Sequence, residues 1–294
     1  MTTFHTGELS VQRQAGLEHE AARLSEMLAP ASLSRGASGF LAQREFAAVT
    51  ARAADGTLWT VPLLGPAGFL DGSGSTLAVH ALPADPLRDF PAGQPAGLLA
   101  VEFATRRRFR VNGTVSYVGE GGFLLDVEQA YGNCPSYLQQ RHLDRTPGPE
   151  PLTVEESSSL TDSHRRLICA ADTLLLGTTH PTHGADTSHK GGEPGFVRLD
   201  GDDFWFPDYA GNNLFNSLGN IAADPTTAVL FLDFTAGAAV HLTGTATLEW
   251  TEAGEGDTAT GRRVRFHPAR VVTVSGLPLH ATGVVPSPHN PTVH

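Results

Sequence analysis

The sequence predicts a mainly β fold with short helices, built as two β-rich halves that pack together. Stretches of alternating apolar and polar residues recur in both halves of the 294-residue chain, and such alternation is typical of strands with one buried face. Glycine and proline are frequent, with 32 and 20 residues, which indicates many turns between short elements. Segments of the two halves also resemble each other, which indicates a repeated unit.

The N-terminal segment, residues 1–35, is predicted to be a helical arm. Its apolar residues follow a near-helical spacing over residues 7–28, and Pro30 would end such a helix. These apolar residues are Leu9, Leu17, Ala21, Leu24 and Leu28. The stretch FHTGEL before the helix is too polar and too short to form core. We therefore expect an arm that packs on the surface of a domain.

The first half, residues 36–145, is predicted to be mostly strand. Ala54-Asp55-Gly56 is a hairpin signal between two of the strands. A short helix is expected at Pro86–Phe90. The predicted strands are Phe46–Arg52, Leu58–Leu64, Thr76–Ala81, Ala96–Phe103, Arg108–Val118 and Phe123–Val127.

A linker and a helix are predicted between the halves. Thr146–Pro151 (TPGPEP) is dense in proline and glycine, which stop regular structure. Thr153 and Glu156 then form a capping-box pattern that predicts a helix, or two short ones, through Ala171. The second half is assigned to residues 153–280. The proline-rich tail that follows, residues 281–294, is expected to be mobile.

The second half repeats the strand signals and adds one clear helix. Residues 212–223 carry an apolar stripe of Leu214, Leu218 and Ile221, and Asp224-Pro225 would end the helix. Asp200-Gly201 is a strong hairpin dipeptide. Residues 264–274 are interpreted as a last strand pair or as a helix followed by a strand. The other predicted strands are Thr173–Thr179, Gly195–Leu199, Asp203–Pro207, Ala228–Phe234 and Val240–Trp250.

Three pairs of segments match in the same order along the chain. AGFL (67–70) resembles PGFV (194–197), AGLLAVEF (96–103) resembles TAVLFLDF (227–234), and RRFRVNGTV (107–115) resembles AAVHLTGTA (238–246). Phe103 lies ten positions before Gly113, as Phe234 does before Gly244. We interpret this as two copies of one β-rich domain. Two small, mostly antiparallel barrels packed together would each hide their edge strands.

Composition excludes several classes of function. The formal net charge of −11 argues against nucleic acid or an anionic membrane as the main partner. No apolar run is long enough to span a membrane, and no secretory signal is apparent. The two cysteines, Cys134 and Cys169, have no metal-like spacing. They are interpreted as reduced thiols of a cytoplasmic protein.

The residues around the predicted helix 212–223 favour an anion site. The first N–H groups of a helix lack partners inside it, and its dipole is positive there, so a phosphate can bind at that end. Asp208 or Asn212 could instead cap the helix. Ser188, His189 and Lys190 stand before two glycines that would let a ligand approach the backbone. The alternative is that SHKGG is an ordinary exposed turn.

Other candidate sites are weaker. Arg106, Arg108 and Arg110 would share one strand face, either as a solvated face that meets acidic residues or as a clamp for phosphate or carboxylate. His180, His183 and His189 have irregular spacing, so no metal site is predicted. The serine-hydrolase elbow, the Walker loop and the dinucleotide-binding glycine motif are absent from the sequence.

Several motifs resemble the flavin-nucleotide-binding branch of the pyridoxamine 5′-phosphate oxidase-like split-barrel family. They are SHKGGEPGFVRL, FPDYAGNNLFNSLGNI and FLDF…HLTG, with FHTGELSVQ and RRRFRVNG…NCPSYLQQR in support. The resemblance covers about residues 5–275. It implies tandem split β-barrels of the FMN-binding type, with FMN at the surface where barrels pair. It also implies that a homodimer is one assembly to expect.

The resemblance implies a set of FMN-binding residues. On the second half these are Ser188, His189, Lys190, Tyr209, Asn212 and Asn213. On the partner face or the other barrel they are Arg108, Arg110, Asn133, Cys134, Tyr137 and Arg141. Two positions depart from the family. The turn beside the helix is Gly211-Asn212-Asn213 instead of basic, which favours a flavin site over the namesake reaction. Ser136 stands where relatives are expected to have lysine.

The resemblance implies a flavin-dependent oxidoreductase acting on a small molecule, with an electron donor such as NAD(P)H. Flavin supplies the redox chemistry, and the protein supplies binding and electrostatics. His189 is the only candidate acid or base. One alternative is a non-catalytic flavin carrier or sensor. Another is a split barrel that binds haem or a deazaflavin, with His180, His183 or His241 as axial candidates for haem.

Overall fold

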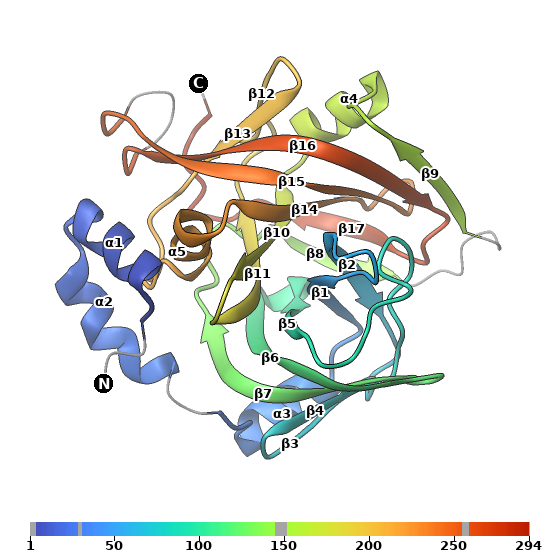
Figure 1. The fold of residues 1–294 in the computed structure, drawn as a ribbon. Coiled ribbons are helices and arrows are strands. Elements are labelled where there is room, and N and C mark those ends of the chain that lie inside the picture. The colour runs from blue at the N-terminus through green and yellow to red at the C-terminus, as the bar shows by residue number, and fades with distance from the viewer. Residues whose placement is uncertain (1–3, 29–30, 145–151, 255–258, 294) are drawn as a thin grey trace.

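The computed structural model describes residues 4–28, 31–144, 152–254 and 259–293. The fold is mainly β, as the sequence predicts. Two large, twisted antiparallel sheets pack against each other, a two-stranded sheet lies at one edge, and a helical arm lies on one side (Figure 1). The linker predicted at Thr146–Pro151 lies outside the described residues. No helix in these ranges is both long enough and apolar enough to cross a membrane.

The first sheet has seven strands in the order β2-β1-β5-β6-β7-β4-β3. Neighbouring strands run antiparallel, and long β6 and β7 bulge where their register shifts at Asn112/Gly113 and at Val115/Tyr117. The strands are β1 (Phe46–Arg52), β2 (Leu58–Leu64), β3 (Leu70–Ser73), β4 (Thr76–Val79), β5 (Pro95–Glu102), β6 (Arg107–Gly119) and β7 (Gly122–Asn133). The helix expected at Pro86–Phe90 is absent, and turns occupy this described segment.

The second sheet has the order β11-β10-β14-β15-β16-β13-β12, with β9 added beside β16. Its long strand β16 is continuous, so both interpretations of residues 264–274, a strand pair and a helix followed by a strand, are wrong. The strands are β9 (Thr153–Ser157), β10 (Thr173–His180), β11 (Gly184–Gly191), β12 (Arg198–Asp200), β13 (Asp203–Pro207), β14 (Thr226–Asp233), β15 (Ala238–Trp250) and β16 (Arg262–Ser275).

The two sheets have the same strand order when their strands are matched in sequence. β1 and β2 take the places of β10 and β11, and β5, β6 and β7 take the places of β14, β15 and β16. The registers agree as well: Leu98 pairs with Val111 in the first sheet, and Val229 pairs with Leu242 in the second. The two halves therefore share one strand order and one register.

The halves meet where β1 and β5 of the first half contact β11 of the second. Thr50 of β1 lies 2.6 Å from Thr187 of β11, hydroxyl to hydroxyl, and Thr187 also donates to the carbonyl of Gly97. Gly97 packs directly on the backbone of β11, since a Cβ there would lie 2.6 Å from Asp186 Cα. Backbone contact this close places the end of β6 beside β11, which positions the pocket described below.

The helices differ from the sequence prediction at several boundaries. They are α1 (Thr6–Ala15), α2 (Glu18–Leu24), η1 (Ser25–Leu28), α3 (Arg35–Ala42), η2 (Phe103–Thr105), α4 (Asp162–Ala170) and α5 (Asn216–Ala223). The continuous helix expected over residues 7–28 is broken, because Gly16 adopts a left-handed conformation after α1. The capping box at Thr153 is also wrong. Residues 153–157 are strand, and Thr161 caps α4 instead.

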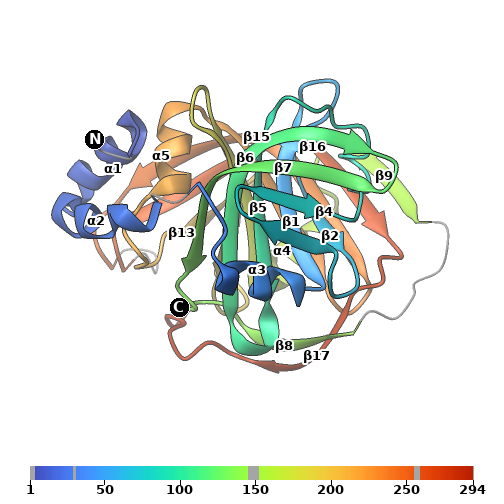
Figure 2. The same ribbon diagram turned by 90° about the horizontal axis from the view of Figure 1, so that it is seen from below.

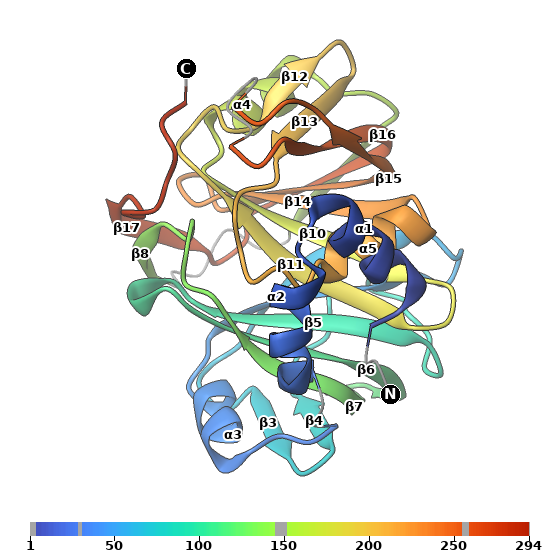
Figure 3. The ribbon, with the colours of Figure 1, turned by 90° about the vertical axis from the view of Figure 1, so that its left-hand side faces the viewer.

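The N-terminal arm is more buried than its polar sequence suggests. Figure 3 shows α1 lying across α5, and Phe4, His5, Glu8 and Gln12 are all buried. The expectation that FHTGEL is too polar for the interior is therefore wrong. Its polar groups find hydrogen-bond partners on the second half, which removes the cost of burying them.

The tail expected to be mobile is ordered where it is described. Strand β17 (His280–Val285) pairs with β8 (Gln140–Asp144) along one edge of the molecule (Figure 2). Beyond it, Ser287 is buried, and its N–H donates to Gln139 Oε1 at 2.7 Å. Pairing with β8 and the hydrogen bond to Gln139 hold these residues in place. Their proline-rich composition does not reveal these contacts.

Candidate functional site

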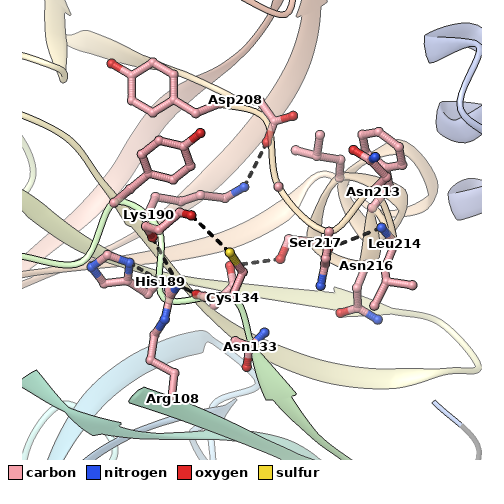
Figure 4. A pocket seen from close by; sticks show the side chains of 18 of the residues that line it. Arg108, Asn133, Cys134, His189, Lys190, Asp208, Asn213, Leu214, Asn216 and Ser217 are labelled. Carbon is pink, nitrogen blue, oxygen red and sulfur yellow. Dashed lines mark hydrogen bonds and ion pairs between the residues drawn. The ribbon is translucent and has the colours of Figure 1, made fainter. Parts of the chain in front are cut away.

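A pocket of about 140 Å³, partly open to solvent, lies between the two halves (Figure 4). The first half contributes β6, the end of β7 and the loop after it, and the second half contributes β11 and the loop from β13 into α5. Of the twelve residues predicted to bind FMN, all but Arg141 line it. They are Arg108, Arg110, Asn133, Cys134, Tyr137, Ser188, His189, Lys190, Tyr209, Asn212 and Asn213.

Arg108 of β6 ties the two halves together at the pocket. Its guanidinium donates to the carbonyls of Cys134 and Ser136 and, at 2.8 Å, to Nδ1 of His189. Among the described residues no carboxylate pairs with it, and its buried Nε has no partner. Burial lowers the pKa of Arg108 to about 10, so it keeps its charge at neutral pH. Arg106 does not share this role, since it donates to the carbonyls of Leu138, Val285 and Pro286.

His189 is held as a neutral hydrogen-bond donor. Because a guanidinium can only donate, Nδ1 of His189 must accept from Arg108, and the ring proton then sits on Nε2. Burial first, and then the charges of Arg108, Arg141 and Lys190, hold the pKa of His189 well below its ordinary value. Its buried Nε2 has no partner in the described chain. This arrangement argues against His189 as a general base.

Asp208 is shared between two cations. Lys190 Nζ and Arg262 Nε lie 3.0 Å from its two carboxylate oxygens, and all three residues line the pocket. One carboxylate between two cations leaves one positive charge. Arg262 is far from the motifs in sequence, so neither it nor this role of Asp208 was found by sequence reasoning.

Arg110 belongs to a buried, neutralised network. It lies 3.0 Å from Asp186 and donates to Tyr131 at 2.8 Å and to Asn216 at 3.4 Å. Burial raises the pKa of Tyr131 to about 12, so this hydroxyl stays protonated. Arg110 is thus a support of the pocket wall, and the clamp predicted for Arg108 and Arg110 rests mainly on Arg108.

Helix α5 starts at Asn216, four residues after the predicted start. Asn212 is not its cap: the Asn212 side chain accepts from the N–H of Leu214 at 3.3 Å. Asn213 and Phe215 both have positive φ, and Phe215 precedes the helix without a side-chain cap. Inside the helix, Ser217 Oγ donates to Ser188 Oγ at 2.9 Å and to Asp186 at 3.0 Å. The first turn of α5 therefore faces the pocket beside β11.

The loop after β7 supplies the remaining predicted residues. Cys134 Sγ lies 3.0 Å from Ser136 Oγ, and Asn133 Oδ1 is buried without a partner in the described structure. Tyr137 stacks at a tilt on Tyr209, with ring centroids 5.1 Å apart, and its hydroxyl donates to the carbonyl of Ala210. The stacked rings join the two halves at this side of the pocket.

Arg141 is not a pocket residue, contrary to the prediction. Its guanidinium lies 2.6 Å from Asp172 and 4.2 Å above the ring of Phe234. Its side chain is 4% exposed. The pairing with Asp172 turns it into the contact between the halves instead of toward the pocket.

The N-terminal arm also contributes residues that sequence reasoning missed. Glu8 of α1 is 2% exposed and accepts from Asn216 Nδ2 at 3.2 Å and from the N–H of His5 at 2.9 Å. Burial raises the pKa of Glu8 to about 7. Asn216 lines the pocket, so Glu8 lies one residue behind the lining. The FHTGEL motif was the available signal, although its polarity suggested exposure.

The raised pKa of Glu8 predicts a pH dependence of stability. A carboxyl whose pKa is higher in the folded than in the unfolded chain favours folding at low pH, and this stability is lost as pH rises to the folded value. The free energy of unfolding of the wild type, relative to Glu8→Gln, should fall by roughly 3 kcal/mol between pH 4 and pH 8. Urea unfolding at several pH values measures it, and parallel curves for the two proteins would contradict the prediction.

The first half lacks a polar counterpart of this pocket. The matching registers put Val61, Pro62 and Leu63 of β2 where β11 has Ser188, His189 and Lys190. Ala239 and His241 of β15 take the places of Arg108 and Arg110. Buried His241 bonds to the carbonyl of Thr60 at 2.9 Å. Among the described residues, the polar side chains at the junction therefore gather on one side, in the pocket lined by β6 and β11.

The histidines considered as metal or haem ligands lie elsewhere. His5, His180 and His183 stack with one another, with ring centroids 4.2 to 5.2 Å apart. The ring of His180 accepts from the backbone of its own turn. Within the described ranges, no group of three His, Cys, Asp or Glu residues is arranged to hold a metal ion. None of His180, His183 and His241 lines the pocket.

The fold and the pocket define a protein of two open, barrel-like halves with a polar pocket at their junction. Residues 160–278 match the model of the pyridoxamine 5′-phosphate oxidase family. Most of the second half is therefore similar in sequence to this family, as its motifs predict. No curated protein is similar enough in sequence to count as a relative.

Solved structures resemble part of the chain. A protein of Clostridium acetobutylicum, related to general stress protein 26 and of the pyridoxinephosphate oxidase family, is 13% identical, covering 41% of this chain and 91% of its own, at a TM-score of 0.28. The heme storage protein HutZ of Vibrio cholerae is 10% identical, and the match covers 40% of this chain and 96% of HutZ at a TM-score of 0.31. An FAD-binding protein of Mesorhizobium loti is 9% identical, and the match covers 45% of this chain and 100% of that protein at a TM-score of 0.31. Likeness this distant carries no argument about the ligand.

Proposed function

We propose that this chain binds one FMN in the pocket between its halves and acts as a flavin-dependent oxidoreductase on a small molecule. The observation that carries the proposal is the charge of the pocket. Arg108 has no carboxylate partner in the described chain, and Lys190 and Arg262 share one, Asp208. Two positive charges are thus left over in a chain whose net charge is −11, which suits the dianionic phosphate of FMN.

The remaining lining also suits a flavin. The buried polar atoms without partners in the described structure include four from the pocket lining, Arg108 Nε, Arg110 Nε, Asn133 Oδ1 and His189 Nε2. Such atoms are costly unless a ligand or water bonds to them. Tyr137, Tyr209 and Phe215 supply aromatic surface. The family usually binds flavin, which supports FMN over other anions.

The protein's own part in a reaction would be binding and electrostatics. Bound flavin accepts and donates electrons or hydride. Arg108, Lys190 and Arg262 would hold the phosphate, and His189 would offer a fixed Nε2–H donor. Nδ1 of His189 accepts from Arg108, and Nε2 carries the ring proton. Neither nitrogen is therefore free to accept a proton, and no other histidine lines the pocket among the described residues. This feature keeps a non-catalytic flavin carrier as the second candidate. Reduction by NAD(P)H followed by substrate turnover would identify an enzyme.

The absorbance spectrum of the purified chain tests the proposal directly. We expect a yellow protein with flavin bands and one FMN per chain, because in the described structure the counterpart positions of the first half are Val61, Pro62 and Leu63. Denaturing release of the flavin, measured against protein concentration, gives this ratio. A colourless protein that does not bind added FMN would overturn the proposal. A ratio of two would contradict the single site, and a Soret band would indicate haem.

A further inference from the structure

The N-terminal helix α1 packs on α5 through glycines. A Cβ on Gly219 of α5 would lie 2.5 Å from Glu8 Cγ and 2.6 Å from Glu8 N. The absence of side chains at Gly219 and Gly7 lets the two backbones approach within direct contact. This proximity brings polar side chains of α1 to the loop that leads into α5.

Three buried polar residues of α1 and its cap each bond to this loop or to α5. Gln12 Nε2 donates to the carbonyl of Leu214 at 3.1 Å, and Glu8 accepts from Asn216 at 3.2 Å. His5 Nε2 lies 3.0 Å from Asn220 Oδ1. All three are buried: His5 is 6% exposed, Glu8 is 2% exposed and Gln12 is 1% exposed. We call them the N-terminal brace.

The loop that the brace contacts needs support. Asn213 and Phe215 adopt positive φ, which costs free energy for residues with a side chain. Phe215 provides no side-chain cap for α5. Leu214, between these two residues, is held by Gln12, and Asn216, directly after them, is held by Glu8. The bonds of the brace thus fall on the strained residues' immediate neighbours.

The brace also sets the direction of a pocket side chain. Since Glu8 accepts from Asn216 Nδ2, the amide oxygen of Asn216 turns to Arg110 Nη1, 3.4 Å away. Asn216, Leu214 and Arg110 all line the pocket. Loss of Glu8 would free the amide to rotate and would remove one fixed point of the loop.

We propose that Glu8 and Gln12 are positioning residues of the ligand site, and that docking of the N-terminal helix and binding of the ligand are coupled. The proposal rests on the proposed function, because FMN is the ligand it invokes. Coupling is reciprocal: if the docked arm strengthens binding, bound FMN strengthens docking by the same factor. The arm is then part of the site, although no residue of α1 lines the pocket.

FMN titration of full-length variants tests the proposal. Glu8→Ala should weaken FMN binding at least tenfold, and Gln12→Ala should weaken it severalfold. Glu8→Gln keeps one acceptor for Asn216 and should recover part of the lost affinity at neutral pH. Because glutamine does not ionise, the affinity of this variant should change less between pH 6 and pH 8 than that of the wild type. The matched control is Glu20→Ala, which removes an exposed carboxylate of the same arm and should bind within twofold of wild type.

Hydrogen exchange separates failure of the brace from failure of the FMN proposal. The backbone amides of residues 213–218 should exchange faster in Glu8→Ala than in wild type without ligand, and FMN should slow exchange in α1 of the wild type. If wild type binds FMN and Glu8→Ala binds it equally well, the brace is refuted and FMN binding stands. If wild type binds no FMN, the proposed function fails, and unchanged exchange in Glu8→Ala would refute the brace as well. Gln12→Ala serves if Glu8→Ala does not fold.

Discussion

Replacing Arg108 by alanine is expected to weaken FMN binding about 100-fold, or about 3 kcal/mol, while the chain stays folded. The change removes a positive charge that has no carboxylate partner in the described structure. It also removes the donors to the carbonyls of Cys134 and Ser136 and leaves Nδ1 of buried His189 unpaired. Fluorescence quenching of FMN during titration measures the affinity, and circular dichroism verifies the fold.

Arg107→Ala is the matched control for this measurement. Arg107 is the neighbouring residue of β6, but it is exposed and lies 4.9 Å from the ring of Phe40, away from the pocket. It changes the net charge of the protein by the same amount, so its effect on FMN should stay below threefold. Equal losses for the two variants would mean that the overall charge attracts the ligand. No loss for Arg108→Ala would place the phosphate elsewhere.

The strands could be predicted because their signals are local. The alternation over Val240–Trp250 reports a strand with one buried face, and β15 spans Ala238–Trp250. Asp200-Gly201 marks the turn between β12 and β13 within a few residues. The pocket residues of β6 and β11 could be named from motifs that lie on such strands, and those strands run beside each other at the junction.

The errors share a different origin, which is contact between residues distant in the chain. Asn212 has the side chain of a good helix cap, yet α5 begins only after Phe215, and Gln12 holds the carbonyl of Leu214 from 202 positions away. Glu8 is a charged residue that sequence reasoning places on a surface. Its partner Asn216 is 208 positions away. A sequence pattern covers a single helix or strand, so it cannot reveal contacts between residues this far apart in the chain.

The shared carboxylate of Asp208 shows the same limit for electrostatics. Lys190 and Arg262 each look like solvated cations in the sequence, and Asp208 looks like a turn residue before a helix. Their convergence depends on the pairing of β13 with β16, which brings Pro207 opposite Arg263. The charge of the pocket is therefore a property of sheet register, and only the assembled sheet reveals that two cations share one acid.

Arg141→Ala is expected to lower the free energy of unfolding by about 3 kcal/mol without a comparable loss of FMN affinity. Removal of one partner of a buried ion pair leaves the other charge uncompensated, and Asp172 would lose the guanidinium 2.6 Å away. The cation–π contact with Phe234 would be lost as well. Urea unfolding measures stability, and FMN titration at low temperature measures affinity on folded protein. Arg13→Ala, which breaks an exposed pair with Glu18, should cost below about 1 kcal/mol. If Arg141→Ala lost much of its FMN affinity while its free energy of unfolding stayed unchanged, Arg141 would be a residue of the ligand site, as the motif implied.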